Sequence, residues 1–184
     1  MISPAGSLPG MDDPALARDI DSRCRLHGRF TLRSGQESEE YFDKYLFEAD
    51  PALLSRVADQ MVGLLPGGTE ILGGLELGGV PIATMLSSRT GLPALFVRKK
   101  AKEYGTRKLA EGPDVAGRVV TLVEDVITTG GAVRAAAEAL RQAGARVEVV
   151  VCAIDRSPDG VEPLADAGLA VRPVLTKAQL DRSR

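Results

Sequence analysis

The sequence predicts an α/β protein in which a parallel β-sheet is flanked by helices. From residue 70 onward, short apolar runs of strand length alternate with helical patterns, an order typical of right-handed βαβ units. The chain has 184 residues, of which 44% are hydrophobic and 26% charged, so one domain with one core is expected. Ligands of such sheets bind at the carboxyl ends of the strands, where we therefore look for functional residues.

The bulk composition argues against several classes of protein. A net charge of −2 gives no electrostatic reason to expect nucleic acid. Cys24 and Cys152 are far apart, without a Cys-x-x-Cys pair, which argues against a disulfide framework or a zinc site and favours a reducing cytoplasm. No run approaches the roughly 18 apolar residues of a membrane span, and residues 1–12 lack signal-peptide features and are expected to be a flexible tail. The single histidine, His27, is expected to be structural.

The N-terminal part of the chain predicts a helix followed by two strands. A helical pattern runs from Asp13 to Cys24 and is expected to end near His27-Gly28, where glycine can take the left-handed conformation of a helix stop. The stretch FTLRSG at 30–35 predicts a short strand that runs into a turn, and EYFDKYLF at 40–47 predicts a second strand.

The rest of the chain predicts helices alternating with strands. A helix begins near Pro51, because the fixed φ of proline suits a first helical position, and ends at Pro66-Gly67-Gly68. The strands that follow are expected at 70–79, 94–100, 119–127 and 147–156, with helices at 80–91 and 132–144.

The strand at 119–127 is followed by a candidate phosphate site. The residues Thr128-Thr129-Gly130-Gly131 stand directly before an alanine-rich helix. A helix start offers unpaired N–H groups and a partial positive charge, and glycine lets the backbone approach a phosphate closely. A capped connection without a ligand would have the same sequence pattern, so this alternative stays open.

The same strand carries two adjacent acids, Glu124 and Asp125, where a P-loop would need a Gly-Lys pair that this chain lacks. Carboxylates repel a bare phosphate, but they accept hydrogen bonds from ribose hydroxyls and suit a nearby magnesium ion. A solvated pair of acids at a strand end is the alternative.

The stretch VEDVITTGG at 123–131 resembles the phosphoribosyl pyrophosphate (PRPP) signature of the type I phosphoribosyltransferases at every position. The resemblance implies a single domain at 13–184, with a small hood at about 13–48 and a core at about 49–184. It places the two acids on the ribose hydroxyls and the loop on the 5′-phosphate. The implied PRPP-binding residues of this motif are Glu124, Asp125, Val126, Ile127, Thr128, Thr129, Gly130, Gly131 and Ala132.

A basic run, RKKAKEYGTRK at 98–108, suits a diphosphate, although such runs are usually solvated faces. It resembles the mobile lid of orotate phosphoribosyltransferases. That resemblance implies that Arg98, Lys99 and Lys102 bind PRPP and act in catalysis by neutralising the leaving diphosphate, with the loop reaching the partner subunit's site. Tyr104 stands where many members have histidine; the resemblance implies that it is a further PRPP contact, although tyrosine is neutral at pH 7.

Two further motifs concern the hood and the base. FTLRSGQESEEYFD at 30–43 resembles the family's hood, which implies that Arg33 binds PRPP and that Tyr41 and Phe42 stack on orotate; ordinary core packing of the two rings is the alternative. Arg156 could clamp a carboxylate through two parallel N–H bonds, or form a surface salt bridge with Asp155 or Asp159. The resemblance makes Arg156 and Thr128 orotate contacts. The ELGG turn at 76–79 matches the loop that approaches the diphosphate, where non-proline cis geometry is possible.

Together these motifs cover most of residues 28–160 and resemble orotate phosphoribosyltransferase. The implied reaction joins orotate to PRPP and gives orotidine 5′-monophosphate and diphosphate in de novo pyrimidine synthesis. Also implied are Mg²⁺, held mainly by PRPP near the acids without direct side-chain ligation, a homodimer, a cytoplasmic location, and no nucleic-acid or membrane partner. A phosphoribosyltransferase for another base, such as a purine, and a PRPP- or nucleotide-sensing regulator stay open; a regulator that binds RNA or DNA would need a basic face.

Overall fold

The computed structural model describes residues 13–31, 35–99 and 109–183. Within these ranges the centre of the molecule is a six-stranded sheet in the order β5-β4-β3-β6-β7-β8. Neighbouring strands are parallel except β4 and β5, which are antiparallel. The strands are β3 (Ile71–Leu75), β4 (Ala94–Val97), β5 (Ala110–Glu111), β6 (Val120–Ile127), β7 (Val149–Asp155) and β8 (Ala170–Thr176). The predicted α/β class is confirmed.

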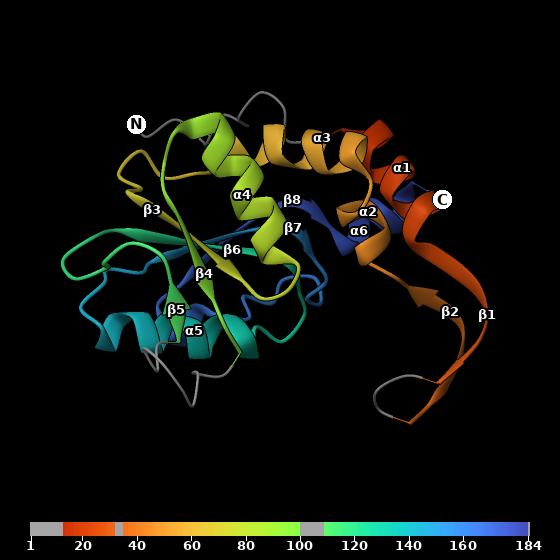
Figure 1. Cartoon of the computed structure of the whole chain (residues 1–184). Coiled ribbons are helices and arrows are strands. Elements are labelled where there is room, and N and C mark those ends of the chain that lie inside the picture. The colour runs from red at the N-terminus through yellow and green to blue at the C-terminus, as the bar shows by residue number, and fades with distance from the viewer. Residues whose placement is uncertain (1–12, 32–34, 100–108, 184) are drawn as a thin grey trace, which may run out of the picture.

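Helices cover both faces of the sheet (Figure 1). One face carries α1 (Pro14–Cys24), α3 (Pro51–Val62) and α4 (Gly79–Thr90), and the other carries α5 (Gly131–Gln142). The starts of α1 and α3 have an identifiable cause. Asp13 and Asp50 cap α1 and α3 by accepting backbone N–H groups, and a proline follows each of them.

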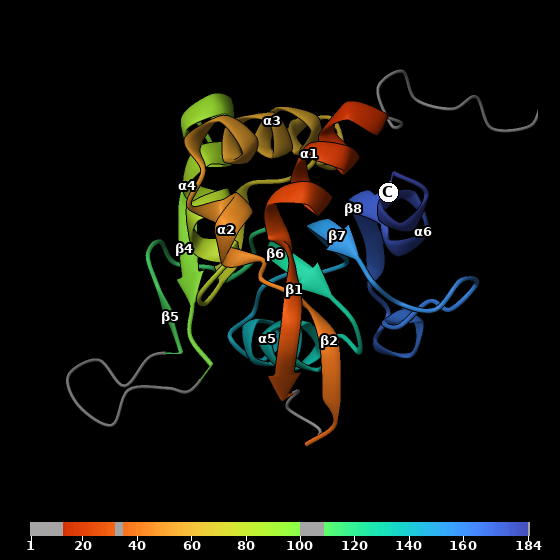
Figure 2. The same ribbon diagram turned by 90° about the vertical axis from the view of Figure 1, so that its right-hand side faces the viewer.

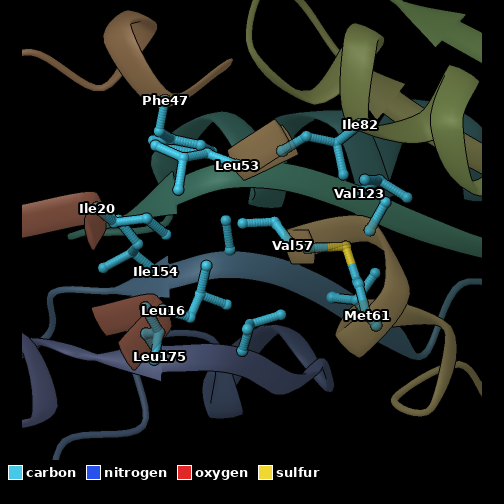
Figure 3. Close-up of a cluster of buried hydrophobic side chains, with 14 of the residues drawn as sticks. Leu16, Ile20, Phe47, Leu53, Val57, Met61, Ile82, Val123, Ile154 and Leu175 are labelled. Atoms are coloured by element: carbon cyan, nitrogen blue, oxygen red, sulfur yellow. The ribbon is translucent and has the colours of Figure 1, made fainter. Parts of the chain in front are cut away.

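The sheet has a hydrophobic cluster on each face, where the sequence predicted one core. Successive side chains of a strand point to opposite faces, so Leu122 of β6 joins the cluster under α5 while the adjacent Val123 joins the cluster under the other helices. Figure 3 shows the larger cluster, in which Leu16, Phe47 and Val57 come from three different helices. A parallel sheet that is buried on both faces needs a layer of helices packed on each face.

The first elements differ from their predicted boundaries. The first helix ends at Cys24, before the predicted stop at His27-Gly28, because the chain from that point pairs as β1 (Arg25–Thr31) with β2 (Glu37–Phe42). The second strand ends at Phe42, so the prediction of a strand through residue 47 was wrong. Residues 45–48 form the short helix α2 (Tyr45–Glu48) instead, started by Asp43, whose side chain accepts the Tyr45 N–H at 3.1 Å.

The C-terminal elements were not predicted from the sequence. Strand β8 contains Pro173, which argues against a strand except at the edge of a sheet, and β8 is indeed an edge strand. The 3₁₀ turn η1 (Ala165–Ala167) and the short helix α6 (Lys177–Arg182) flank it. Thr176 and Gln179 form a capping box that begins α6.

The carboxyl ends of β6 and β7 point toward the β1–β2 hairpin (Figure 2). Of the described residues predicted to be functional, Glu124, Asp125 and Arg156 lie at this edge. Among the described helices, none is long and apolar enough to cross a membrane. The predicted flexible tail at 1–12 lies outside the described residues.

Candidate active site

The predicted phosphate loop connects β6 to α5. Gly130 has a left-handed backbone with φ of 70°, and a Cβ atom there would lie 2.6 Å from the buried Leu164 side chain, so only glycine fits. A Cβ on Gly131 would meet nothing within 4 Å. Thr128 and Thr129 are exposed, and no side chain of the described residues caps α5. The first N–H groups of this helix are therefore open to an anion.

The loop after β7 is tied to the phosphate loop. The backbone N–H of Arg156 donates to the Ile127 carbonyl oxygen at 2.8 Å, and the Ser157 hydroxyl donates to the Thr128 carbonyl oxygen at 3.1 Å. Asp155, one of the predicted alternative partners of Arg156, accepts the Ser157 N–H. Two of the predicted sites are thus held side by side. Sequence reasoning missed Ser157, whose only signal was its position directly after the arginine.

The two acids of β6 are buried. Glu124 is 8% exposed and Asp125 is 0% exposed, which contradicts the alternative of a solvated pair. Glu124 accepts the Asp125 N–H at 3.0 Å, and Asp125 accepts the Val126 N–H at 2.5 Å. The Lys44 ammonium lies 2.5 Å from Asp125 Oδ2. Sequence reasoning missed Lys44, which comes from the turn before α2.

Burial and mutual contact shift the pKa values of the acids in opposite directions. Burial, together with a hydrogen bond to Asp125 and its charge, raises the pKa of Glu124 to about 9. The same causes raise the pKa of Glu48, on α2, to about 8. Burial alone would raise the pKa of Asp125, but hydrogen bonds from Glu124, Lys44 and Glu48 lower it below its usual value. One carboxylate therefore carries the charge beside two acids that hold protons at neutral pH.

These shifts predict that the free energy of unfolding falls as pH rises. The folded protein holds protons on Glu48 and Glu124 that the unfolded chain releases near pH 4.5, so stability from these groups is present below that pH and is lost toward pH 8–9. Urea denaturation between pH 5 and 9 measures this slope. Glu48→Gln, which cannot ionise, is expected to make the slope shallower, whereas Glu138→Gln on the exposed face of α5 leaves it unchanged. Stability that rises over this range would contradict the assignment.

The ELGG turn packs on the acids. The Glu76–Leu77 peptide bond is cis, as the resemblance allowed. A Cβ atom on Gly78 would lie 1.7 Å from Asp125 Oδ2 and 2.6 Å from Glu48 Oε1. The glycine is therefore required by the close approach of the turn to the two carboxyl groups.

Gly78→Ala is expected to lower the free energy of unfolding by about 2 kcal/mol or more, since the added methyl group must push buried groups apart. It should also weaken any ligand held by the acids. The matched control is Gly67→Ala, because a Cβ there meets nothing within 4 Å. Urea denaturation of both variants checks the prediction. Equal urea midpoints for the two variants would show that the turn accommodates the methyl group without a loss of stability.

Arg156 lies over the ring of Phe42, with its guanidinium carbon 5.3 Å from the ring centroid. Burial and the nearby Arg25 lower the pKa of Arg156, and Asp181 opposes them. A half-buried arginine beside another cation is a favourable place for a ligand carboxylate. Tyr41 points to the opposite face of β2 and packs against Phe30, with the two ring centroids 5.5 Å apart. The structure therefore brings Phe42, but not Tyr41, to Arg156.

Arg98 and Lys99 follow β4 and line a cavity of about 100 Å³ together with Ala132 of α5. The Lys99 N–H donates to Glu76 Oε1 at 2.6 Å, which fixes the turn after β4 beside the ELGG turn. Arg98 and Lys99, which the sequence predicted to bind the diphosphate, thus line the same cavity as the start of α5. Arg33, Lys102 and Tyr104 lie outside the described residues.

Several polar side chains gather at this edge, but in the described ranges no group of three or more His, Cys, Asp or Glu is arranged to hold a metal ion. Asp125 already faces the Lys44 ammonium, and the raised pKa of Glu124 makes it a poor ligand for a bare cation. The acids suit hydroxyl groups better than direct metal coordination. His27 lies on the exposed hairpin, where Nδ1 is 3.7 Å from Glu40 Oε1.

Comparison with known proteins adds to this geometry. Residues 50–167 match the phosphoribosyl transferase domain family. An orotate phosphoribosyltransferase from a Nocardioides species is 78% identical over 172 residues, which cover 94% of this chain and 96% of that protein.

Among solved structures, Mycobacterium tuberculosis H37Rv orotate phosphoribosyltransferase in complex with Fe(III) dicitrate superposes with a TM-score of 0.81 at 34% identity, covering 94% of this chain and 99% of the other. The same enzyme in complex with PRPP superposes with a TM-score of 0.76 at 31% identity and the same coverage.

Proposed function

The chain belongs to the orotate phosphoribosyltransferases, and from this premise we infer that the carboxyl edge of its sheet binds PRPP and orotate side by side. The enzyme transfers the phosphoribosyl group from PRPP to orotate and gives orotidine 5′-monophosphate and diphosphate, a step of pyrimidine synthesis. The hydrogen bond from the Arg156 N–H to the Ile127 carbonyl oxygen carries the proposal. It holds a carboxylate-binding arginine beside a phosphate-binding loop, which transfer between the two substrates requires.

We propose that PRPP lies along β6 and the start of α5. The N–H groups at the start of α5 bind the 5′-phosphate, and the acids of β6 accept hydrogen bonds from the ribose hydroxyls. Arg98 and Lys99, which line the cavity next to α5, bind the diphosphate. The remaining proposed PRPP contacts are Arg33, Lys102, Tyr104 and the backbone of residues 126–132.

Orotate is proposed to lie between Arg156 and Thr128, with its carboxylate on the guanidinium and its ring near Phe42. This placement fits the contact of Arg156 with Phe42. Because Tyr41 points to the other face of β2, it reaches the same base only if the hairpin rotates.

The chemistry is a substitution at C1 of the ribose. The bond from C1 to the diphosphate oxygen breaks as a bond to the orotate nitrogen forms, and the proton on that nitrogen is released to the leaving diphosphate or to solvent. Positive charge therefore grows on the sugar and negative charge on the leaving group. Arg98, Lys99 and Lys102 neutralise the leaving diphosphate. Mg²⁺, when bound through PRPP oxygens near the acids, supplies further charge neutralisation. The chain also excludes water, which would otherwise hydrolyse PRPP.

Three wider features belong to the same proposal. Residues 13–48 form a hood on a single domain that spans 13–184. Two copies of the chain form a homodimer in which the lid loop that carries Lys102 in one subunit reaches the site of the other. The enzyme acts in the cytoplasm, consistent with the free, buried Cys24 and Cys152.

The test is to mix the purified protein with PRPP, orotate and Mg²⁺ and to follow both products. Orotidine 5′-monophosphate and diphosphate are expected in equal amounts, and a chelator should stop their formation until Mg²⁺ is restored. Diphosphate released without orotidine 5′-monophosphate would mean hydrolysis of PRPP and would contradict the proposed placement of orotate.

A further inference from the structure

Lys44 connects the N-terminal segment to the end of β6. Its ammonium lies 2.5 Å from Asp125 Oδ2, and the lysine side chain is 34% exposed whereas the aspartate side chain is 0% exposed. Only one residue separates Lys44 from Phe42, which contacts Arg156. A three-residue stretch of chain thus spans from the proposed base site to the proposed ribose site.

Glu48, one helical turn after Lys44, also lies close to Asp125. Its carboxyl group is buried, and burial and a hydrogen bond to Asp125 raise its pKa to about 8. The Gly78 turn approaches both carboxyl groups, because a Cβ atom there would lie 1.7 Å from Asp125 Oδ2 and 2.6 Å from Glu48 Oε1. Asp125 is therefore close to the Lys44 ammonium, the Glu48 carboxyl group and the Gly78 turn.

The pair is unusual as a purely structural feature. A buried ion pair is often no more stabilising than well-packed apolar residues of the same size, because both charges lose their hydration. The larger hydrophobic cluster, which includes Phe47 and Val123, is formed by apolar side chains. Its packing does not require an ion pair. The pair stands instead at the carboxyl end of β6, where ligands of parallel sheets bind.

We propose that Lys44, backed by Glu48, is a positioning residue for PRPP: it holds the Asp125 carboxylate in place as an acceptor for the ribose hydroxyls. This inference rests on the proposed function. Because Asp125 is fully buried, the hydroxyls reach it when the Lys44 ammonium or the Gly78 turn shifts aside. Until then the ion pair keeps the carboxylate aligned and without a proton. Lys44 itself takes no part in bond breaking.

Lys44→Ala is expected to raise the KM for PRPP by at least about tenfold, with a smaller change in the KM for orotate and in kcat. Lys44→Arg should recover part of the loss, because it restores the charge. The matched control is Lys177→Ala, which removes an exposed Lys–Asp pair of the same 2.5 Å length and should leave all three constants unchanged. A KM for PRPP that is unchanged or lower in Lys44→Ala would overturn the proposal.

A double-mutant cycle with Asp125→Asn separates positioning from direct contact. If Lys44 acts through Asp125, adding Lys44→Ala to Asp125→Asn changes the KM for PRPP no further; additive losses would mean that Lys44 meets the substrate directly and would reject a positioning role. Lys44→Gln, which keeps an N–H donor, replaces Lys44→Ala if that variant does not fold. Turnover of the unmodified enzyme is measured alongside, so failure of the proposed function is seen separately.

Discussion

Lys102→Ala is expected to lower kcat by about 10²–10³-fold while the protein stays folded, because it removes a cation that neutralises the leaving diphosphate in the transition state. The KM for either substrate should change much less, since this charge matters most when the bond to diphosphate is breaking. Lys102 itself lies outside the described residues. The expectation rests on the motif at 98–105 and on Arg98 and Lys99, which line the cavity beside α5.

Lys108→Ala is the matched control, because it removes a charge from the same basic run without an assigned role. Steady-state kinetics with both substrates varied would separate kcat from the KM values, and urea denaturation would establish that the variant is folded. A near-normal kcat in Lys102→Ala would reject the catalytic role.

Arg156→Ala is expected to raise the KM for orotate by about 30-fold or more, because a ligand carboxylate in a half-buried site would lose its charged partner. The KM for PRPP should be nearly unchanged. Arg156→Lys should recover only part of the affinity, since an ammonium cannot form two parallel N–H bonds. Arg118→Ala is a suitable control, because Arg118 pairs with Glu70 at the other end of the sheet. Equal effects on both KM values would mean that Arg156 stabilises the fold rather than binding orotate.

Mixing these two variants tests the proposed exchange between subunits. In a homodimer whose lid loop carries Lys102 into the neighbouring site, one site of each mixed dimer combines an intact Lys102 with an intact Arg156. Random exchange of subunits is then expected to restore about a quarter of the unmodified activity. Activity that stays at the level of the separate variants after exchange would place both residues in the same subunit's site.

The sequence predicted the parallel sheet and the order of its main helices, because apolar runs and caps are local signals. VEDVITTGG also located the loop between β6 and α5, since its glycines report backbone geometry that the structure shows at Gly130. The end of α1 and the strand at 40–47 were less predictable. Their boundaries depend on pairing between β1 and β2, which is a tertiary contact.

The contacts around the acids could not be predicted for the same reason. Lys44 and Asp125 are distant in the sequence, and Glu48 followed the predicted strand at 40–47 without any signal of its own; only the fold brings the three together. Tyr41 and Phe42 are adjacent in the sequence, but the alternation of side chains along β2 sends them to opposite faces. Adjacency in a strand therefore argues against a shared pocket.

The most direct test of the account offers orotate, uracil, adenine, hypoxanthine and guanine separately, each with PRPP and Mg²⁺, and follows diphosphate release. Release with orotate alone is expected, because only orotate presents a carboxylate to Arg156. Uracil tests the contribution of the carboxylate alone, because it is the same pyrimidine without the carboxylate. Release with a purine, or equal rates with uracil and orotate, would contradict the account.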